Sequence, residues 1–119
     1  GKTFLVRAIC RAMGLDAGVR VVSPTFTLIR ELDTLPRVAH ADLYRLASTE
    51  DAHELGLAEL RERGLVLLVE WGEAHADALG PDLLRLVIEL GPRRVRLGAS
   101  GPRSEALRQT LVAALAAGP

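Results

Sequence analysis

The first residues of the chain are of the types that hold phosphate in nucleotide-binding proteins. Gly1-Lys2-Thr3 matches the last three positions of the Walker A motif, G-x-x-x-x-G-K-[ST]. In that motif backbone N–H groups surround the phosphates, the lysine contacts the β- and γ-phosphates, and the hydroxyl binds Mg²⁺. Lys2 is the only lysine in a chain with 15 Lys and Arg residues. We therefore expect Gly1, Lys2, Thr3 and the adjacent Phe4 to contact a nucleotide such as ATP, with Thr3 as a ligand of Mg²⁺.

A helix is predicted directly after this triplet. Apolar residues recur at spacings of three and four from Leu5 to Met13, and Gly14 is a natural end for the helix. The N-terminus of such a helix offers free N–H groups and the positive end of the helix dipole to an anion. The helix thus supports a phosphate site at its first turn.

Glu70 is the first candidate acid for such a site. It follows a run of five apolar residues, 65–69, which is typical of a strand covered on both faces of a sheet. A P-loop ATPase needs an acidic residue at the end of a buried strand to hold Mg²⁺. The alternative is that Glu70 caps the strand end or pairs with an arginine.

Asp42 is the second candidate acid, and His40 precedes it by two residues. On a strand the two side chains would project from the same face. A zinc site is a weaker interpretation, because the single Cys10 lies on the first helix and no His-x-x-x-His spacing occurs. We expect no structural zinc, and for His40 alone we favour a structural hydrogen bond over catalysis.

Two further features flank these acids. Residues 23–28 form a hydroxyl-rich segment containing Thr25, which could close over a γ-phosphate or could be a proline-initiated turn. Trp71, the single tryptophan, directly follows Glu70. It either packs at the edge of the site or belongs to a docking surface.

Composition limits the class of protein. The chain has 119 residues, 49% of them hydrophobic, and a formal net charge of +0. This predicts one globular domain, residues 1–119, and gives no support to a non-specific polyanion binder. The lone cysteine, the lack of a long apolar run and the lack of a signal-peptide pattern favour a cytoplasmic protein without a membrane segment.

The remaining segments predict an α/β protein. Strands are expected at residues 19–22, 27–32, 37–41 and 65–69, short helices at 49–55 and 57–63, an antiparallel hairpin from 82–90 and 93–97, and a last helix at 103–117.

These pieces, in this order, resemble the TsaE (YjeE) family of small bacterial P-loop ATPases. The resemblance covers roughly residues 1 to 90 and rests on five segments: Gly1-Lys2-Thr3, Ser23-Pro24-Thr25-Phe26, His40-Ala41-Asp42-Leu43-Tyr44-Arg45, Leu55-Gly56-Leu57-Ala58-Glu59 and Val69-Glu70-Trp71. It implies a P-loop NTPase-like three-layer sandwich with a mixed, mainly parallel central sheet and a C-terminal antiparallel hairpin. The family's first strand and the start of its phosphate-binding loop have no counterpart here, so we expect a chain shortened inside the Walker A loop.

The resemblance also implies an activity and its partners. The family's members bind ATP and Mg²⁺ and act with a Kae1-type transferase and its paralogue, of the TsaD and TsaB type, in the N6-threonylcarbamoyladenosine modification of tRNA. The ATPase would meet tRNA indirectly, through that complex.

The resemblance assigns roles to individual residues. Lys2 would contact the phosphates, Thr3 would coordinate Mg²⁺ and Thr25 would belong to a switch-like loop. Glu70 would be the second metal-site acid and Asp42 would orient or deprotonate the attacking water, although the division between these two carboxylates stays open. Trp71 would lie close to the nucleotide.

Two other functions are compatible with the sequence. One is a small-molecule kinase on the same fold, which would need a pocket for a second substrate. The other is a non-catalytic interaction module, because a fold alone does not determine a function.

Overall fold

The computed structural model describes residues 1–24, 27–92 and 94–118. The chain divides into two compact units, Gly1–Leu79 and Gly80–Pro119. The prediction of a single domain over residues 1–119 stays a prediction. No helix in the described part of the chain is both long enough and apolar enough to cross a membrane.

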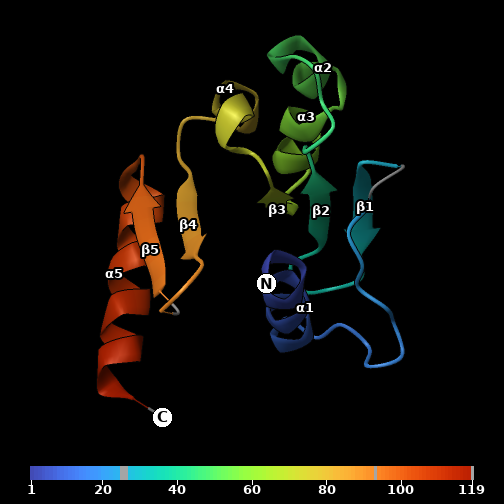
Figure 1. Cartoon of the computed structure of the whole chain (residues 1–119). Helices are drawn as coiled ribbons and strands as arrows, with labels where there is room; N and C mark the ends of the chain where they lie inside the picture. The colour runs from blue at the N-terminus through green and yellow to red at the C-terminus, as the bar shows by residue number, and fades with distance from the viewer. Residues whose placement is uncertain (25–26, 93, 119) are drawn as a thin grey trace. The chain divides into compact units, whose positions relative to one another are not determined.

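The first unit contains a three-stranded sheet and the helices around it (Figure 1). Its elements are α1 (Lys2–Ala12), β1 (Ile29–Leu32), β2 (Val38–Asp42), α2 (Thr49–Glu54), α3 (Leu57–Glu62), β3 (Val66–Glu70), the 3₁₀ turn η1 (Glu73–His75) and α4 (Ala76–Leu79). β2 is the central strand, antiparallel to β1 and parallel to β3. β2 has a neighbouring strand on each side, and all five of its residues are buried.

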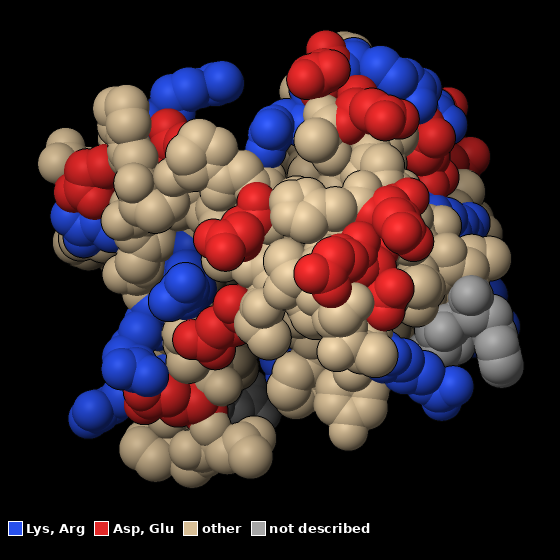
Figure 2. All heavy atoms as spheres, turned by 90° about the horizontal axis from the view of Figure 1, so that it is seen from above, with Lys and Arg blue, Asp and Glu red and all other residues tan. Residues whose placement is uncertain are grey.

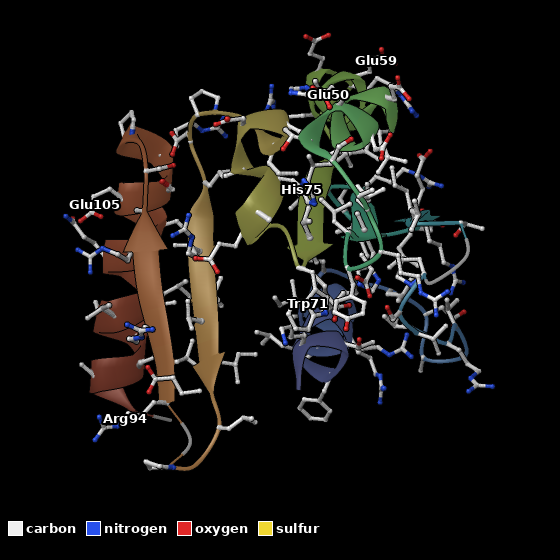
Figure 3. The ribbon with its side chains drawn as sticks, turned by 45° about the horizontal axis from the view of Figure 1, so that its top comes forward. Glu50, Glu59, Trp71, His75, Arg94 and Glu105 are labelled. Atoms are coloured by element: carbon white, nitrogen blue, oxygen red, sulfur yellow. The ribbon has the colours of Figure 1, made fainter. Side chains whose placement is uncertain are left out.

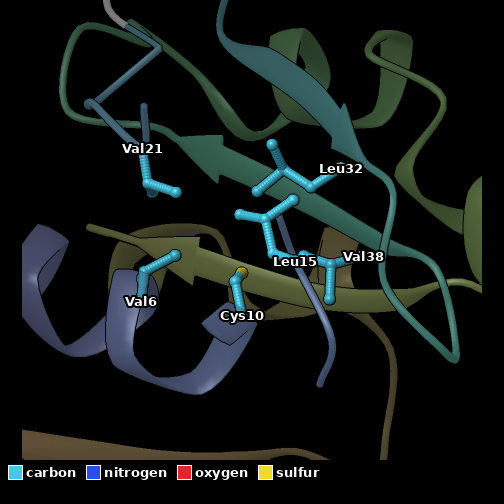
Figure 4. Packing of buried hydrophobic residues seen from close by; sticks show 6 residues of the cluster. All are labelled: Val6, Cys10, Leu15, Val21, Leu32 and Val38. Carbon is cyan, nitrogen blue, oxygen red and sulfur yellow. The ribbon is translucent and has the colours of Figure 1, made fainter. Parts of the chain in front are cut away.

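The core of this unit lies between α1 and the sheet. Among the described residues, six buried side chains form one cluster there, and Figure 4 shows them: Val6, Cys10, Leu15, Val21, Leu32 and Val38. Burial raises the pKa of the Cys10 thiol, as expected for a group whose charged form is excluded from an apolar core. The core therefore holds α1 in a fixed position relative to the strands.

The crossover between the parallel strands β2 and β3 consists of α2 and α3. Ser48 caps α2, because its Oγ accepts a hydrogen bond from the Asp51 N–H at 3.2 Å. Gly56 separates the two helices at φ 79°, a left-handed conformation that favours glycine. Figure 2, viewed from the end of the molecule where α2 and α3 lie, shows acidic and basic side chains gathered over these helices.

The second unit is a hairpin with a helix. β4 (Leu84–Glu89) and β5 (Arg94–Ala99) pair in antiparallel fashion, and α5 (Pro102–Ala117) follows. The Asp82 carboxylate accepts hydrogen bonds from the backbone N–H groups of Arg103 and Ser104, both at 2.9 Å. Asp82 thus satisfies free donors at the start of α5, where a carboxylate also complements the helix dipole.

The predicted fold class is confirmed. The structure is α/β, with a mixed sheet and a C-terminal antiparallel hairpin, and the predicted helices are present. The strand predicted at residues 19–22 is wrong, since this stretch is turn and irregular chain although Val21 packs in the core. β1 begins at Ile29 rather than at residue 27, because Leu28 has a φ of 63° and interrupts the extended chain. Thr25 and Phe26 lie outside the described residues.

The irregular stretch before β1 allows a matched stability test. Val21 is 3% exposed and Val22 is 48% exposed, so the same substitution samples core and surface at adjacent positions. We expect Val21→Ala to lower the free energy of unfolding by about 1 to 3 kcal/mol. Val22→Ala should change it by less than about 0.5 kcal/mol. Urea denaturation measures both, and equal effects would contradict the packing of Val21.

Candidate active site

The first turn of α1 lies at the carboxyl end of β3. The Thr3 hydroxyl donates a hydrogen bond that is shared between the two carboxylate oxygens of Glu70, Oε1 at 3.0 Å and Oε2 at 3.1 Å. Gly1 is the N-cap of the helix, so the N–H groups of the first turn have no partner inside α1. Free N–H donors and a carboxylate therefore adjoin each other.

Glu70 is the last residue of β3 and its carboxylate is almost fully buried, at 6% exposure. Its Oε2 also lies 2.7 Å from His40 Nε2. A buried carboxylate is costly unless hydrogen-bond donors surround it. Thr3 and His40 supply those donors from α1 and β2.

Asp42 ends β2 and pairs in parallel register with Glu70. Its Oδ2 accepts a hydrogen bond from the Ser23 hydroxyl, and its Oδ1 accepts one from the Tyr44 N–H at 3.0 Å. The Leu43 N–H donates to the Glu70 carbonyl at 3.0 Å, which keeps the two strand ends together. Two buried acids thus lie side by side, each with its own set of donors.

A small open pocket reaches Asp42 from the surface. It is lined by Leu28, Asp42, Tyr44 and Arg45. Asp42 therefore lines a small surface hollow together with an arginine, a residue that favours anions.

An aromatic pair, Trp71 and Tyr44, lies beside the site. Trp71 has a φ of 59°, and its half-exposed ring lies 4.9 Å from the ring of Tyr44, between centroids. The Lys2 ammonium lies 4.2 Å from the centroid of the Trp71 ring, within the range of a cation–π interaction. Figure 3 shows Trp71 at the end of β3, close to the start of α1.

The structure brings most of the predicted site residues together. Lys2, Thr3, Asp42, Glu70 and Trp71 share the contacts described above. Gly1 lies at the same helix end.

Phe4 and Thr25 stand apart from that cluster. The Phe4 ring is 68% exposed and contacts the guanidinium of Arg7 at 5.9 Å rather than either acid, so only its backbone lies at the helix end. Thr25 lies outside the described residues, and its predicted role stays a prediction.

Three contacts of the site were not assigned from the sequence. Ser23 bonds to Asp42, His40 bonds to Glu70 and Tyr44 contacts Trp71. The sequence contains partial signals for the first two contacts. Ser23 lies in the hydroxyl-rich loop, and His40 shares a strand face with Asp42. Nothing in the local sequence indicates which acid each would meet.

The oxygen atoms at this site suit magnesium. Mg²⁺ binds hydroxyl and carboxylate oxygens and is usually held by one or two carboxylates together with phosphates and water. Thr3 and Glu70 offer this donor set, and Asp42 lies next to it. Within residues 1–24, 27–92 and 94–118, no cluster of three or more His, Cys, Asp or Glu side chains could by itself hold a metal ion.

Comparisons with known proteins place the chain in a family. Residues 1–96 match the family model described as "Threonylcarbamoyl adenosine biosynthesis protein TsaE". A TsaE protein of Rickettsia felis is 36% identical over 98 residues, which are 82% of this chain and 56% of that protein. One of Treponema pallidum is 39% identical over 79 residues, 66% of this chain and 57% of that protein. The chain thus spans little more than half the length of these relatives.

A solved structure is also similar. The crystal structure of YdiB from Bacillus subtilis superimposes with a TM-score of 0.69 and 26% sequence identity, over 94% of this chain and 69% of that one. The likeness agrees with the α/β fold described above. Because the family model covers most of the chain, the chain belongs to the TsaE family of threonylcarbamoyl adenosine biosynthesis proteins.

Proposed function

We propose that this protein is the ATP-binding and ATP-hydrolysing component of the machinery that makes N6-threonylcarbamoyladenosine in tRNA. The observation that carries the proposal is the contact between Thr3, in the first turn of α1, and the buried Glu70 at the end of β3. A lysine-threonine pair at a helix start, facing an acid at a strand end, is what a magnesium-nucleotide site requires. The family of the chain supports the biosynthetic role.

The residues of the first turn bind and orient the phosphates. The free N–H groups of α1 and the Lys2 ammonium would hold the phosphate oxygens. Because the Lys2 ammonium lies over the Trp71 ring, phosphate binding would turn the flexible lysine stem away from that ring. Mg²⁺, bound by the Thr3 hydroxyl and the Glu70 carboxylate, would neutralise charge on the phosphates.

Of the two acids, Asp42 is the better candidate for the residue that orients the attacking water. Glu70 is already held by Thr3, which suits a cation ligand, whereas Asp42 borders an open pocket. Its carboxylate is fixed by Ser23 and the Tyr44 N–H, so it can orient a water molecule or accept its proton without reorganising. The two acids therefore have different roles. Glu70 binds the cation, and Asp42 orients the attacking water.

The partners follow from the same proposal. The ATPase would act together with a Kae1-type transferase and its paralogue, of the TsaD and TsaB type. It would contact tRNA only indirectly, through that complex. The site of action would be the cytoplasm. The Trp71 and Tyr44 rings, half-exposed and exposed beside the phosphate site, would lie close to the bound nucleotide.

Removal of the Lys2 charge should weaken nucleotide binding. We expect Lys2→Ala to lower the affinity for ATP with Mg²⁺ by about 10- to 100-fold, the equivalent of one charge-assisted hydrogen bond. Isothermal titration calorimetry with ATP and Mg²⁺ on the wild type and the variant measures this. Arg7→Ala is the matched control, because Arg7 is an exposed cation of the same helix that contacts Phe4. Equal affinities for Lys2→Ala and the wild type would show that Lys2 does not bind phosphate.

Loss of the Asp42 charge should affect turnover more than binding. With the TsaB- and TsaD-type partners present, we expect Asp42→Asn to lower kcat for ATP hydrolysis by about 10²- to 10⁴-fold, the range of a lost general base. The affinity for ATP should stay within about 3-fold, a difference under 1 kcal/mol. Asp33→Asn, at an exposed carboxylate, is the control. A fall in affinity as large as that of Lys2→Ala, with kcat unchanged, would contradict this division of roles.

A further inference from the structure

His40 is a polar residue in the middle of an apolar strand. It is completely buried, and its neighbours on β2 are the buried Val38, Ala39 and Ala41. An imidazole at such a position is costly unless its polar atoms are bonded. Its one described partner is the Glu70 carboxylate, 2.7 Å from Nε2.

The surroundings of the ring determine which nitrogen carries the proton. Among the described residues, His40 Nδ1 has no hydrogen-bond partner and no exposed surface. A proton on Nδ1 would be a buried donor without an acceptor. An unprotonated Nε2 would direct its lone pair at the carboxylate oxygen of Glu70, and two acceptors at this distance repel each other. His40 therefore carries its proton on Nε2 and donates it to Glu70 Oε2.

This hydrogen bond fixes the rotation of the Glu70 carboxylate. Oε2 receives donors from both His40 and Thr3, whereas Oε1 receives the Thr3 hydroxyl alone. We propose that His40 is a positioning residue that locks this carboxylate and so leaves Oε1 as the oxygen available to a divalent cation. The inference rests on the proposed magnesium-nucleotide function, and His40 acts through Glu70 without touching the nucleotide.

His75 provides a matched control for burial alone. It is also a buried histidine of the first unit, and within the described part of the chain its Nδ1 also has no hydrogen-bond partner. His75 lies in η1, where its backbone N–H bonds to the Gly72 carbonyl, and it takes no part in the contacts of Glu70 given above. A loss that follows from removing any buried imidazole should appear at both positions.

The test measures how Mg²⁺ changes nucleotide affinity. Calorimetry with ADP, with and without Mg²⁺, is carried out on the wild type and on the variants His40→Leu, His40→Gln and His75→Leu. We expect His40→Leu to lower the magnesium-dependent gain in affinity by about 10- to 100-fold, the usual effect of losing a group that orients a metal ligand. Affinity without Mg²⁺ should be unchanged. His40→Gln, whose amide N–H can replace Nε2–H, and His75→Leu should both behave as the wild type.

Two results would overturn the inference. One is a normal magnesium effect in His40→Leu, and the other is an equal loss in His40→Leu and His40→Gln, which would mean that the ring only fills space. If His40→Leu does not fold, His40→Asn replaces it, because the asparagine amide nitrogen corresponds to Nδ1 rather than Nε2. If the wild type bound no nucleotide, the proposed function would be contradicted, whereas the hydrogen bond between His40 and Glu70 would not.

Nuclear magnetic resonance of the imidazole nitrogens tests the contact without any ligand. In protein labelled with ¹⁵N at histidine, His40 should show a proton on Nε2, the nitrogen that faces Glu70. Its Nε2–H signal should shift in Glu70→Ala and stay in place in His75→Leu. A proton on Nδ1 instead of Nε2 would refute the positioning role whatever the nucleotide experiments show.

Discussion

The burial of the Glu70 carboxylate is the constraint on which the first unit depends. A charge in this position needs donors, and they come from a helix 67 residues earlier in the chain and from the neighbouring strand. The hydrogen bond from Thr3 therefore does two things at once. It satisfies the acid, and it places the free N–H groups of α1 beside that acid. The candidate site is a direct consequence of satisfying one buried charge.

The parallel pairing of β2 and β3 brings the second acid to the same place. Because both strands point the same way, their carboxyl ends meet at one edge of the sheet, and Asp42 stands opposite Glu70. A parallel pair needs a long crossover, which α2 and α3 provide. The apolar core under α1 keeps the helix start in register with those strand ends. Fold and site are thus held by the same few contacts.

Local patterns in the sequence predicted the elements that carry the chemistry. The apolar run before Glu70 and the periodic residues after Thr3 identified β3 and α1, because burial and helical period are local signals. The prediction of a strand at residues 19–22 was wrong, because β-branched residues favour a strand only where a partner strand is present. The contacts of Ser23 and His40 with the acids depend on how distant segments pack, which no local pattern encodes.

The central claim is that the start of α1 and the end of β3 form one cation-nucleotide site. Paramagnetic Mn²⁺ in place of Mg²⁺ tests it directly, since it broadens the amide resonances of residues near the metal. With ADP present, we expect the backbone signals of Thr3 and Glu70 to be broadened first, while those of the acidic helices α2 and α3 stay sharp. Broadening centred on α2 and α3, with Thr3 and Glu70 unaffected, would contradict the account.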